Sequence, residues 1–419
     1  MSLALRYFKV QKARFGDRTL LSDGVLTINK DELQDILLED PVIASLDIEI
    51  VQPGESVRII HVMDAIEPRI KVEGTGGIFP GFTGQLDTVG VGITNVLQGI
   101  AVIQTGQRQG IQEGIIDMTG PGAELSSFSK LCNIVLVPKL IENVGAVEFD
   151  QTMRMAGLKV ADYLSKVTLN IEHDYEEVFN LSVSDDQGSE ILPRLVYVYH
   201  LQSQGLLRNT FVYGHEALNI LPTLINPTEI FDGAIVSSNY IIACQKNPTY
   251  LHVNNPVVLE LARRHGKDLY FAGVILTNEN STLADKSRSA IYVAKLAKIT
   301  KADGVIITQE GGGHSDTDLM MVCKECEKIG IKTVVIANEI AGPEGKLPSL
   351  VDTVPEAVAI VSTGNNDECI NLDAVKRVLG GKTIFGRTES ANDAFKTSLG
   401  IMYCATNQLG MSKLTTQQF

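Results

Sequence analysis

Leu269-Tyr-Phe-Ala-Gly-Val-Ile-Leu-Thr277 and Gly304-Val-Ile-Ile-Thr308 are short apolar runs, and the residues between them, over 284–299, have the spacing of a helix. The same alternation continues in a predicted helix over Thr317–Ile329 and in predicted strands over Lys332–Ala337 and Ala357–Ser362. Strands that alternate with helices on short connections indicate βαβ units, right-handed crossovers and a parallel sheet. Ligands of such sheets bind outside the carboxyl ends of the strands.

The middle of the chain has a similar pattern. Cys132-Asn-Ile-Val-Leu-Val137 and Leu195–Tyr199 are predicted strands, with a predicted helix over Val147–Lys166 between them. Two prolines within Leu221–Glu229 rule out a long helix there, and Glu229–Asn255 is predicted to be mostly strand and loop.

The first 125 residues or so alternate like an antiparallel β region, as in Asp47–Val51 and Val57–His61. We therefore predict an α/β protein with a β-rich N-terminal part, followed by two Rossmann-like parallel-sheet halves with the site between them. The predicted domains are a β-rich, glycine-looped domain over 1–125, a first α/β part over 126–255 and a second Rossmann-like α/β domain over 256–419.

The composition excludes several functional classes. Lys and Arg number 36 against 50 Asp and Glu, so the net charge is −14, which disfavours nucleic acid as a partner. Residues 1–11 lack the apolar stretch of a signal peptide, and no run approaches the roughly 18 apolar residues of a membrane span. We expect a soluble cytoplasmic protein whose six cysteines are reduced thiols.

Two glycine-rich segments are candidates for binding loops. The first, between Gly74 and Gly92, is read either as a set of tight turns or as a loop that lines a site. The second, Glu310-Gly-Gly-Gly-His-Ser-Asp316, leads from a strand end into a helix start, where backbone N–H groups can bind an anion. Ser315 or Asp316 could instead simply cap the helix. Neither a Walker loop nor a dinucleotide fingerprint is present.

Polar residues at the predicted strand ends are the candidates for substrate binding. Asn278 and Glu279 follow one strand, and Gly312 and His314 follow the next. The imidazole of His314 is a group that can titrate near neutral pH.

The cysteines differ in their surroundings. Cys323 and Cys326 have metal-ligand spacing but lie inside a predicted helix without a second pair, so no metal site is predicted. Cys244 lies outside any predicted helix, close to Lys246 and to Asn247-Pro248. These neighbours are compatible with a reactive thiol, although a buried inert thiol is the other reading.

Several further motifs, in order and spacing, carry a family resemblance through most of the chain. They include Glu67-Pro-Arg69, Phe79-Pro-Gly-Phe82, Leu201-Gln-Ser-Gln-Gly205, Pro227-Thr-Glu-Ile-Phe-Asp-Gly-Ala234, Asn247-Pro-Thr-Tyr250 and Asn407-Gln-Leu-Gly410. With these motifs the sequence resembles the component B proprotein of the glycine, sarcosine and betaine reductases, and the related D-proline reductase proprotein.

The resemblance implies an oxidoreductase subunit of amino-acid fermentation. In this family an internal cysteine becomes a pyruvoyl group, and the chain is split into two subunits that stay together. The pyruvoyl group forms a Schiff base with a substrate amine. A selenocysteine- or cysteine-containing partner subunit then performs the reductive deamination, which implies a hetero-oligomer.

The resemblance leaves the precursor position open between 240 and 244. Tyr240 has no leaving group on its β-carbon, so Cys244 is the candidate, with Ala243–Cys244 as the scissile bond. Lys246 and His252 are candidates for assisting proton transfer. The alternative is an unprocessed, non-catalytic relative that binds ligand or scaffolds the partner. Which amine is the substrate does not follow from the sequence.

Overall fold

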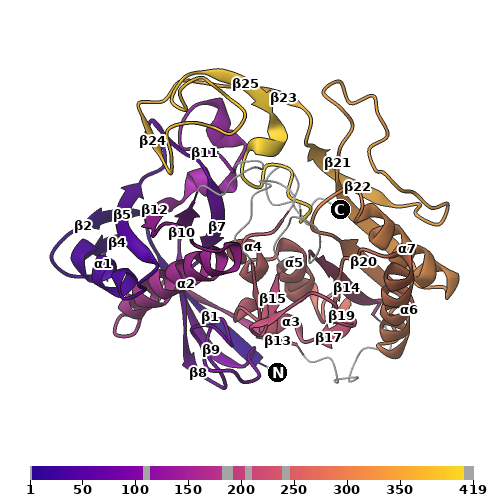
Figure 1. Ribbon diagram of the computed structural model, residues 1–419. Helices are drawn as coiled ribbons and strands as arrows, with labels where there is room; N and C mark the ends of the chain where they lie inside the picture. Colours follow the sequence, from indigo (N-terminus) through magenta and orange to yellow (C-terminus); the bar gives the residue numbers. More distant parts are fainter. Residues whose placement is uncertain (1, 107–113, 182–191, 203–209, 238–245, 410–419) are drawn as a thin grey trace.

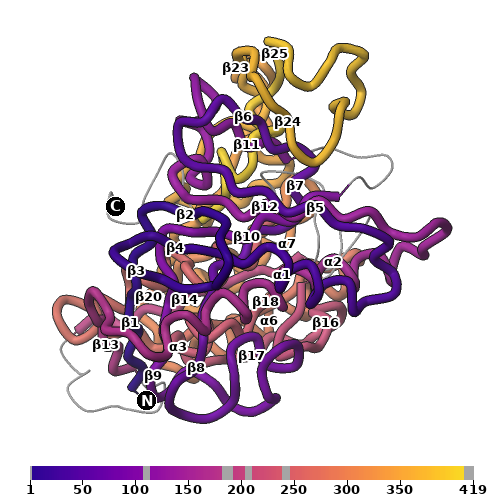
Figure 2. Tube along the Cα trace, turned by 90° about the vertical axis from the view of Figure 1, so that its left-hand side faces the viewer, coloured from indigo at the N-terminus to yellow at the C-terminus, as the bar shows by residue number. Residues whose placement is uncertain are grey.

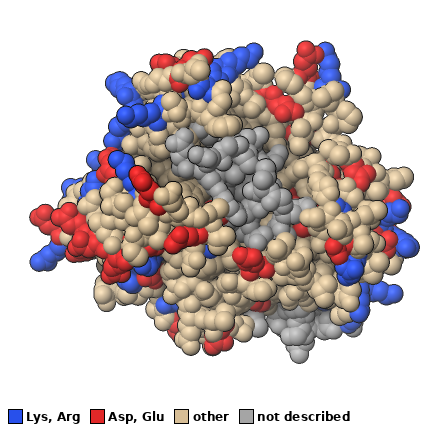
Figure 3. Space-filling model, in the orientation of Figure 1, with Lys and Arg blue, Asp and Glu red and all other residues tan. Residues whose placement is uncertain are grey.

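The computed structural model describes residues 2–106, 114–181, 192–202, 210–237 and 246–409. A β-rich part lies on the left of Figure 1, an α/β part on the right, and the C-terminal strands lie above both. Within the described ranges, no helix is long and apolar enough to cross a membrane. On the face in Figure 3, acidic side chains gather where α1 (Lys30–Leu38) lies, and basic side chains form separate small groups among acidic ones.

Thirteen strands and the long helix α2 (Ala146–Ser165) make up most of the β-rich part. The strands are β1 (Ser2–Lys9), β2 (Lys12–Phe15), β3 (Leu20–Ser22), β4 (Val25–Ile28), β5 (Ile43–Val51), β6 (Val57–Ile59), β7 (Val62–Ile66), β8 (Arg69–Glu73), β9 (Gly92–Gln98), β10 (Ile100–Thr105), β11 (Ile116–Asp117), β12 (Cys132–Leu140) and β13 (Tyr175–Asn180). Two four-stranded sheets dominate, with the orders β13-β1-β9-β8 and β5-β12-β10-β7.

The pairing in these sheets is mixed, whereas the sequence predicts antiparallel strands. β1 pairs with β9, and β10 with β12, in parallel, while β5–β12 and β1–β13 are antiparallel. Parallel neighbours cannot be joined by a tight hairpin, and β1 and β9 are indeed far apart in the chain. Local alternation therefore identified strands but not their direction.

The parallel sheet predicted from the last part of the chain is confirmed. Its order is β17-β19-β14-β20-β21-β22, and the antiparallel pair is β17–β19. The strands are β14 (Arg194–Leu201), β17 (Thr223–Ile225), β19 (Tyr270–Asn278), β20 (Gly304–Thr308), β21 (Lys332–Glu339) and β22 (Ile360–Asn365). The helices α6 (Leu283–Ile299) and α7 (Asp316–Lys328) lie side by side against this sheet (Figure 1), and α5 (Pro256–Arg264) packs against β19.

Strand β14 lies in the middle of this sheet although it comes from the middle of the chain. It pairs in parallel with β19 on one side and β20 on the other, with Tyr199 opposite Leu276 and Thr308. Alternate residues enter different cores: Val196 and Val198 pack with α6 and α7, while Tyr197 and Tyr199 face the core shared with the β-rich part. The three-part domain division stays a prediction, and the sheet joins strands from the second and third of those parts.

Short elements complete the described chain. They are the 3₁₀ turns at Pro121–Glu124, Ser127–Lys130, Lys166–Thr168 and Leu399–Ile401, the strands β15 (Phe211–Val212), β16 (His215–Glu216), β18 (Ile235–Val236), β23 (Cys369–Leu372), β24 (Arg377–Leu379) and β25 (Phe395–Ser398), and the helices α3 (Pro227–Phe231) and α4 (Thr249–Val253). Helix α4 falls within a segment that the sequence predicts to be mostly strand and loop.

The C-terminal strands are anchored to the β-rich part by a buried arginine. Figure 2 shows β24 beside β6, with which it pairs in parallel. Arg58 of β6 is completely buried and forms a two-pronged ion pair with Asp117, at 2.6 and 2.8 Å. The same guanidinium donates to the carbonyls of Asp373, Ala391 and Asp393. Five donated hydrogen bonds satisfy the buried group fully.

We predict that Arg58→Met lowers the free energy of unfolding by about 3 to 5 kcal/mol, because it leaves the Asp117 carboxylate buried without its cation. Arg377→Met is the matched control, since Arg377 also joins β24 to the β-rich part, through Glu49, but its side chain is 42% exposed. The control should cost at most about 1 kcal/mol. Urea unfolding measures both, and equal losses would contradict the anchoring role of Arg58.

Candidate active site

Glu310 follows β20 with only Gln309 between them, and its side chain is completely buried. Its Oε1 accepts a hydrogen bond from the backbone N–H of Asn247 at 2.8 Å. Its Oε2 accepts from the backbone N–H of Gln202 at 2.7 Å and from the hydroxyl of Thr210 at 3.1 Å. One carboxylate therefore fixes three separate stretches of chain at the carboxyl ends of β14 and β20, where a parallel sheet binds its ligands.

A buried polar network adjoins this carboxylate. The side-chain amide of Asn247 donates to the hydroxyl of Tyr199 at 2.6 Å, and that hydroxyl lies 2.9 Å from Nδ1 of His252. Because the phenol oxygen accepts from Asn247, its own proton can be donated to Nδ1, which places the ring proton of a neutral His252 on Nε2. Nε2 lies 3.8 Å from Oε1 of Glu310 and has no hydrogen-bond partner among the described residues.

His252 is neutral in this network. Burial and the charge of Lys246 lower the pKa of His252 to about 3. Its contact with Glu310 is therefore not an ion pair at neutral pH. The imidazole presents a buried N–H donor and is not a group that exchanges protons in the physiological range.

Lys246 is the cation of the site and is only 2% exposed. Burial lowers the pKa of Lys246 to about 8, while Glu310, Glu279 and Asp64 in their ionised forms act in the opposite direction. Near neutral pH, a measurable fraction of Lys246 is consequently the neutral amine, which can accept a proton.

The β-rich part contributes Asp64 from β7. Its Oδ1 accepts from the backbone N–H of Thr249 at 2.8 Å, and its Oδ2 accepts from the Thr249 hydroxyl at 2.7 Å. The Thr249 hydroxyl also accepts from the N–H of Ser237 at 3.0 Å. Burial raises the pKa of Asp64 to about 7. These bonds join the residues on either side of 238–245 and fix the start of α4 beside Lys246.

The last described residues of the chain close the same region. The side-chain amide of Asn407 donates to the side-chain carbonyl of Asn247, and Gln408 donates to the carbonyl of Gly311 at 2.6 Å. The hydroxyl of Thr363, on β22, donates to the carbonyl of Thr406 at 3.0 Å. Both side chains of the pair Asn407–Gln408 are buried.

The structure brings some of the sequence-predicted catalytic residues together. Lys246 and His252 both lie at the Glu310 carboxylate, whereas Cys244 lies outside the described residues, as does Tyr240. The catalytic roles stay predictions.

The predicted substrate-binding residues are spread more widely. Asn278 and Glu279 are buried at the end of β19, and the N–H of Glu279 donates to the carbonyl of Leu201 at 3.0 Å. Gly312 is half-buried and His314 is exposed. Their substrate-binding role stays a prediction.

The second glycine-rich segment is held by a buried ion pair between α6 and α7, the helices on the face of the sheet opposite to Tyr199. Lys286 of α6 contacts Asp318 of α7 and donates to the carbonyl of His314 at 3.0 Å. Ser315 occupies the cap position of α7, but its side chain makes no capping hydrogen bond, and Asp316 instead accepts from the N–H of Val351 at 2.8 Å. The segment is thus fixed by tertiary contacts more than by helix capping.

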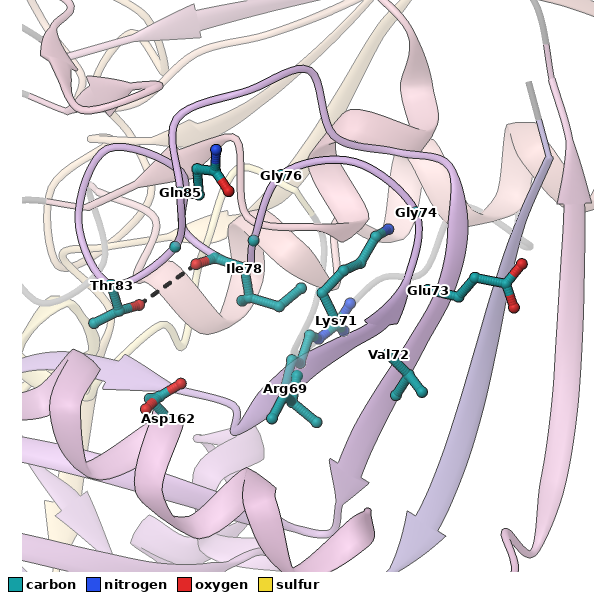
Figure 4. Close-up of a pocket in the computed structure, with 13 residues that line it drawn as sticks. Arg69, Lys71, Val72, Glu73, Gly74, Gly76, Ile78, Thr83, Gln85 and Asp162 are labelled. Carbon is teal, nitrogen blue, oxygen red and sulfur yellow. Dashed lines mark hydrogen bonds between the residues drawn. The ribbon is translucent and has the colours of Figure 1, made fainter.

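The first glycine-rich segment lines a pocket of about 300 Å³ beside β8 (Figure 4). A Cβ at Gly77 would lie 2.7 Å from the Cα of Gly84, so the two backbones touch and exclude side chains. The ammonium of Lys71, which lines the pocket, is paired with the buried Asp232. The loop combines tight turns with the lining of a pocket, and this pocket is separate from the Glu310 network.

Sequence reasoning did not single out Glu310, Asp64 or Tyr199. Glu310 begins a glycine-rich loop at a strand end, and that position was a usable signal. No local pattern pointed to Asp64, because its hydrogen-bond partner Thr249 lies 185 residues further along the chain. Tyr199 lies within a predicted buried strand, where a tyrosine has the pattern of a core residue.

The family model "Glycine/sarcosine/betaine reductase component B subunits" matches residues 1–417. "Glycine reductase complex component B subunits alpha and beta" of Acetoanaerobium sticklandii is 46% identical over 430 residues, with 100% of both chains covered. "Sarcosine reductase complex component B subunit alpha" of Peptoclostridium acidaminophilum is 42% identical over 426 residues, again with 100% of both covered.

A more distant relative is the D-proline reductase proprotein of Acetoanaerobium sticklandii. It is 19% identical over 361 residues, which cover 83% of this chain and 56% of the relative. No solved structure matches the chain significantly. The family model and the two full-length relatives agree from end to end, and the chain belongs to the glycine/sarcosine/betaine reductase component B family.

Proposed function

We propose that this chain is the substrate-activating subunit of a glycine/sarcosine/betaine-type or proline-type reductase. In this proposal Cys244 is converted to a pyruvoyl group, and the chain is cut between Ala243 and Cys244. The observation that carries the proposal is the buried arrangement of Lys246, Asn247 and His252 around Glu310, because these residues come shortly after Cys244 in the sequence.

The described residues fit such a group. A pyruvoyl carbonyl supplies an electrophile for a substrate amine. The free Nε2–H of His252 is a donor suited to an oxygen atom in its vicinity, and burial provides the low dielectric in which such a bond is strong. Lys246, with a pKa of about 8, can take a proton from an ammonium substrate, which makes the substrate amine nucleophilic.

The reducing step requires a second protein. This sequence contains no selenocysteine. In this proposal the selenol or thiol that attacks the substrate lies on a partner reductase subunit. The names of the relatives place them in reductase complexes, which is consistent with such a partner.

The fold is compatible with a cut between residues 243 and 244. Strand β14 would belong to the first piece and lie between β19 and β20 of the second. One full-length relative carries two subunits, alpha and beta, in its name. The alternative is an unprocessed relative that binds ligand or scaffolds the partner, and the integrity of the chain distinguishes the two.

We predict that the intact mass under denaturing conditions shows two pieces, 1–243 and 244–419. Hydroxylamine, or borohydride with an amine, should shift the mass of the second piece alone, because only that piece begins with the carbonyl. Cys244→Ala should give one uncut chain, since alanine has no group to attack or to leave. Tyr240→Phe is the matched control and should be cut normally. A single unmodified wild-type chain would refute the processing.

We further predict that the cut protein elutes from a native sizing column as one species, at the position of uncut Cys244→Ala. Separating the pieces would expose both edges of β14 and its fully buried Val196 and Val198. Denaturant should release the two pieces together with the loss of secondary structure. Separate native elution would show that the shared sheet does not hold them.

A further inference from the structure

We propose that Glu310 is the positioning residue of this site: its carboxylate holds Asn247 against Gln202 and opposes Lys246 with a negative charge. The inference rests on the proposed function, in which the residues after Cys244 serve the reaction. It goes beyond that function by assigning the orientation of this segment, and its pH response, to one side chain on another loop.

The geometry leaves Glu310 little freedom. Oε1 is occupied by the N–H of Asn247, and Oε2 by the N–H of Gln202 and the hydroxyl of Thr210. All donors are directed at a side chain with no solvent exposure. A glutamine at this position would offer one acceptor oxygen and would turn an N–H₂ group toward another N–H. One of the two backbone segments would then lose its partner, which is costly in a buried site.

Glu310 acts on Lys246 together with other carboxylates. Lys246 interacts electrostatically with Glu310 on the loop after β20, with Glu279 at the end of β19, with Asp64 on β7 and with Asp150 on α2. Among these carboxylates, Glu310 has the largest effect in raising the pKa of Lys246 against burial. Burial raises the pKa of Glu310, and the charge of Lys246 acts against that rise.

The protonation of Lys246 and that of Glu310 therefore depend on each other. With Glu310 ionised, Lys246 is held near half-protonation at mildly alkaline pH. Without that charge, burial would leave Lys246 mostly neutral at lower pH. Glu310 thus sets the pH at which the amine next to the reaction site can accept a proton.

The test follows the titration of Lys246 itself, in protein labelled with ¹³C at the lysine ε-carbon. Lys246→Arg identifies the resonance by its disappearance. In Glu310→Gln the midpoint of the titration should fall by about one pH unit, because one nearby negative charge is lost. In Glu310→Asp the Lys246 midpoint should fall by less, because the negative charge remains and the side chain is only one methylene group shorter.

Asp316→Asn is the matched control. Asp316 is a buried carboxylate at the start of α7, where the same loop ends, but it accepts from Val351 and Gln309 and is not among the main charges that act on Lys246. The control should leave the Lys246 midpoint unchanged. If both Glu310 variants keep the wild-type midpoint, or if Asp316→Asn lowers it equally, the role assigned to Glu310 is wrong. If Glu310→Gln does not fold, Glu310→Asp decides the question by the same criterion.

The readout separates this inference from the proposed function. The titration needs neither substrate nor a cut chain, so an uncut wild-type protein would end the processing proposal while still testing Glu310. Conversely, if the protein is processed but the titration midpoint of Lys246 is the same in the Glu310 variants as in the wild type, the proposed function stands and the role of Glu310 is refuted.

Discussion

The position of β14 is the constraint on which the rest of the molecule depends. This strand is reached before the crossover helices of the α/β part, yet it is the one between β19 and β20. Because it runs parallel to both, its carboxyl end is at the same edge as theirs. Gln202 therefore meets Glu310 at that edge. The core on the Tyr197 side also joins the sheet to the β-rich part, so the site forms where both parts meet.

Burial then determines what the site residues can do. A carboxylate, an ammonium and an imidazole are enclosed together, and the low dielectric makes each interaction strong and each missing partner costly. Three accepted hydrogen bonds compensate Glu310 for its lost hydration, and for Lys246 the loss of hydration appears as a lowered pKa. His252 remains neutral. The same burial that makes these interactions strong leaves Lys246 able to accept a proton near neutral pH and leaves His252 as a neutral hydrogen-bond donor.

The sequence predicted the elements better than their partners. Apolar runs and helical spacing identified β19, β20, β21, α6 and α7 to within about two residues at most ends, because each pattern is local. Strand β22 begins at Ile360 and not at Ala357 as predicted. Val358 belongs to the apolar run but lies before the paired strand, where its side chain is 83% exposed. The insertion of β14, and the reach of Arg58 to residues more than 300 positions away, depend on tertiary packing that no local pattern encodes. The same difference holds for the candidate site. Lys246 and His252 are close to Cys244 in the sequence and could be predicted, whereas Asp64 becomes part of the site only through folding.

The contacts around residues 238–245 bear on how a chain could be cut there and remain functional. Gln202, Thr210 and Asp64 precede the proposed cut, whereas Asn247, Thr249 and Glu310 follow it. The hydrogen bonds between these two sets are buried, so breaking them would leave charged or polar groups without water. They do not depend on the peptide bond between residues 243 and 244. The side chains of Glu310 and Asp64 thus reach across the proposed cut, and together with the shared sheet they would keep the two sides in register.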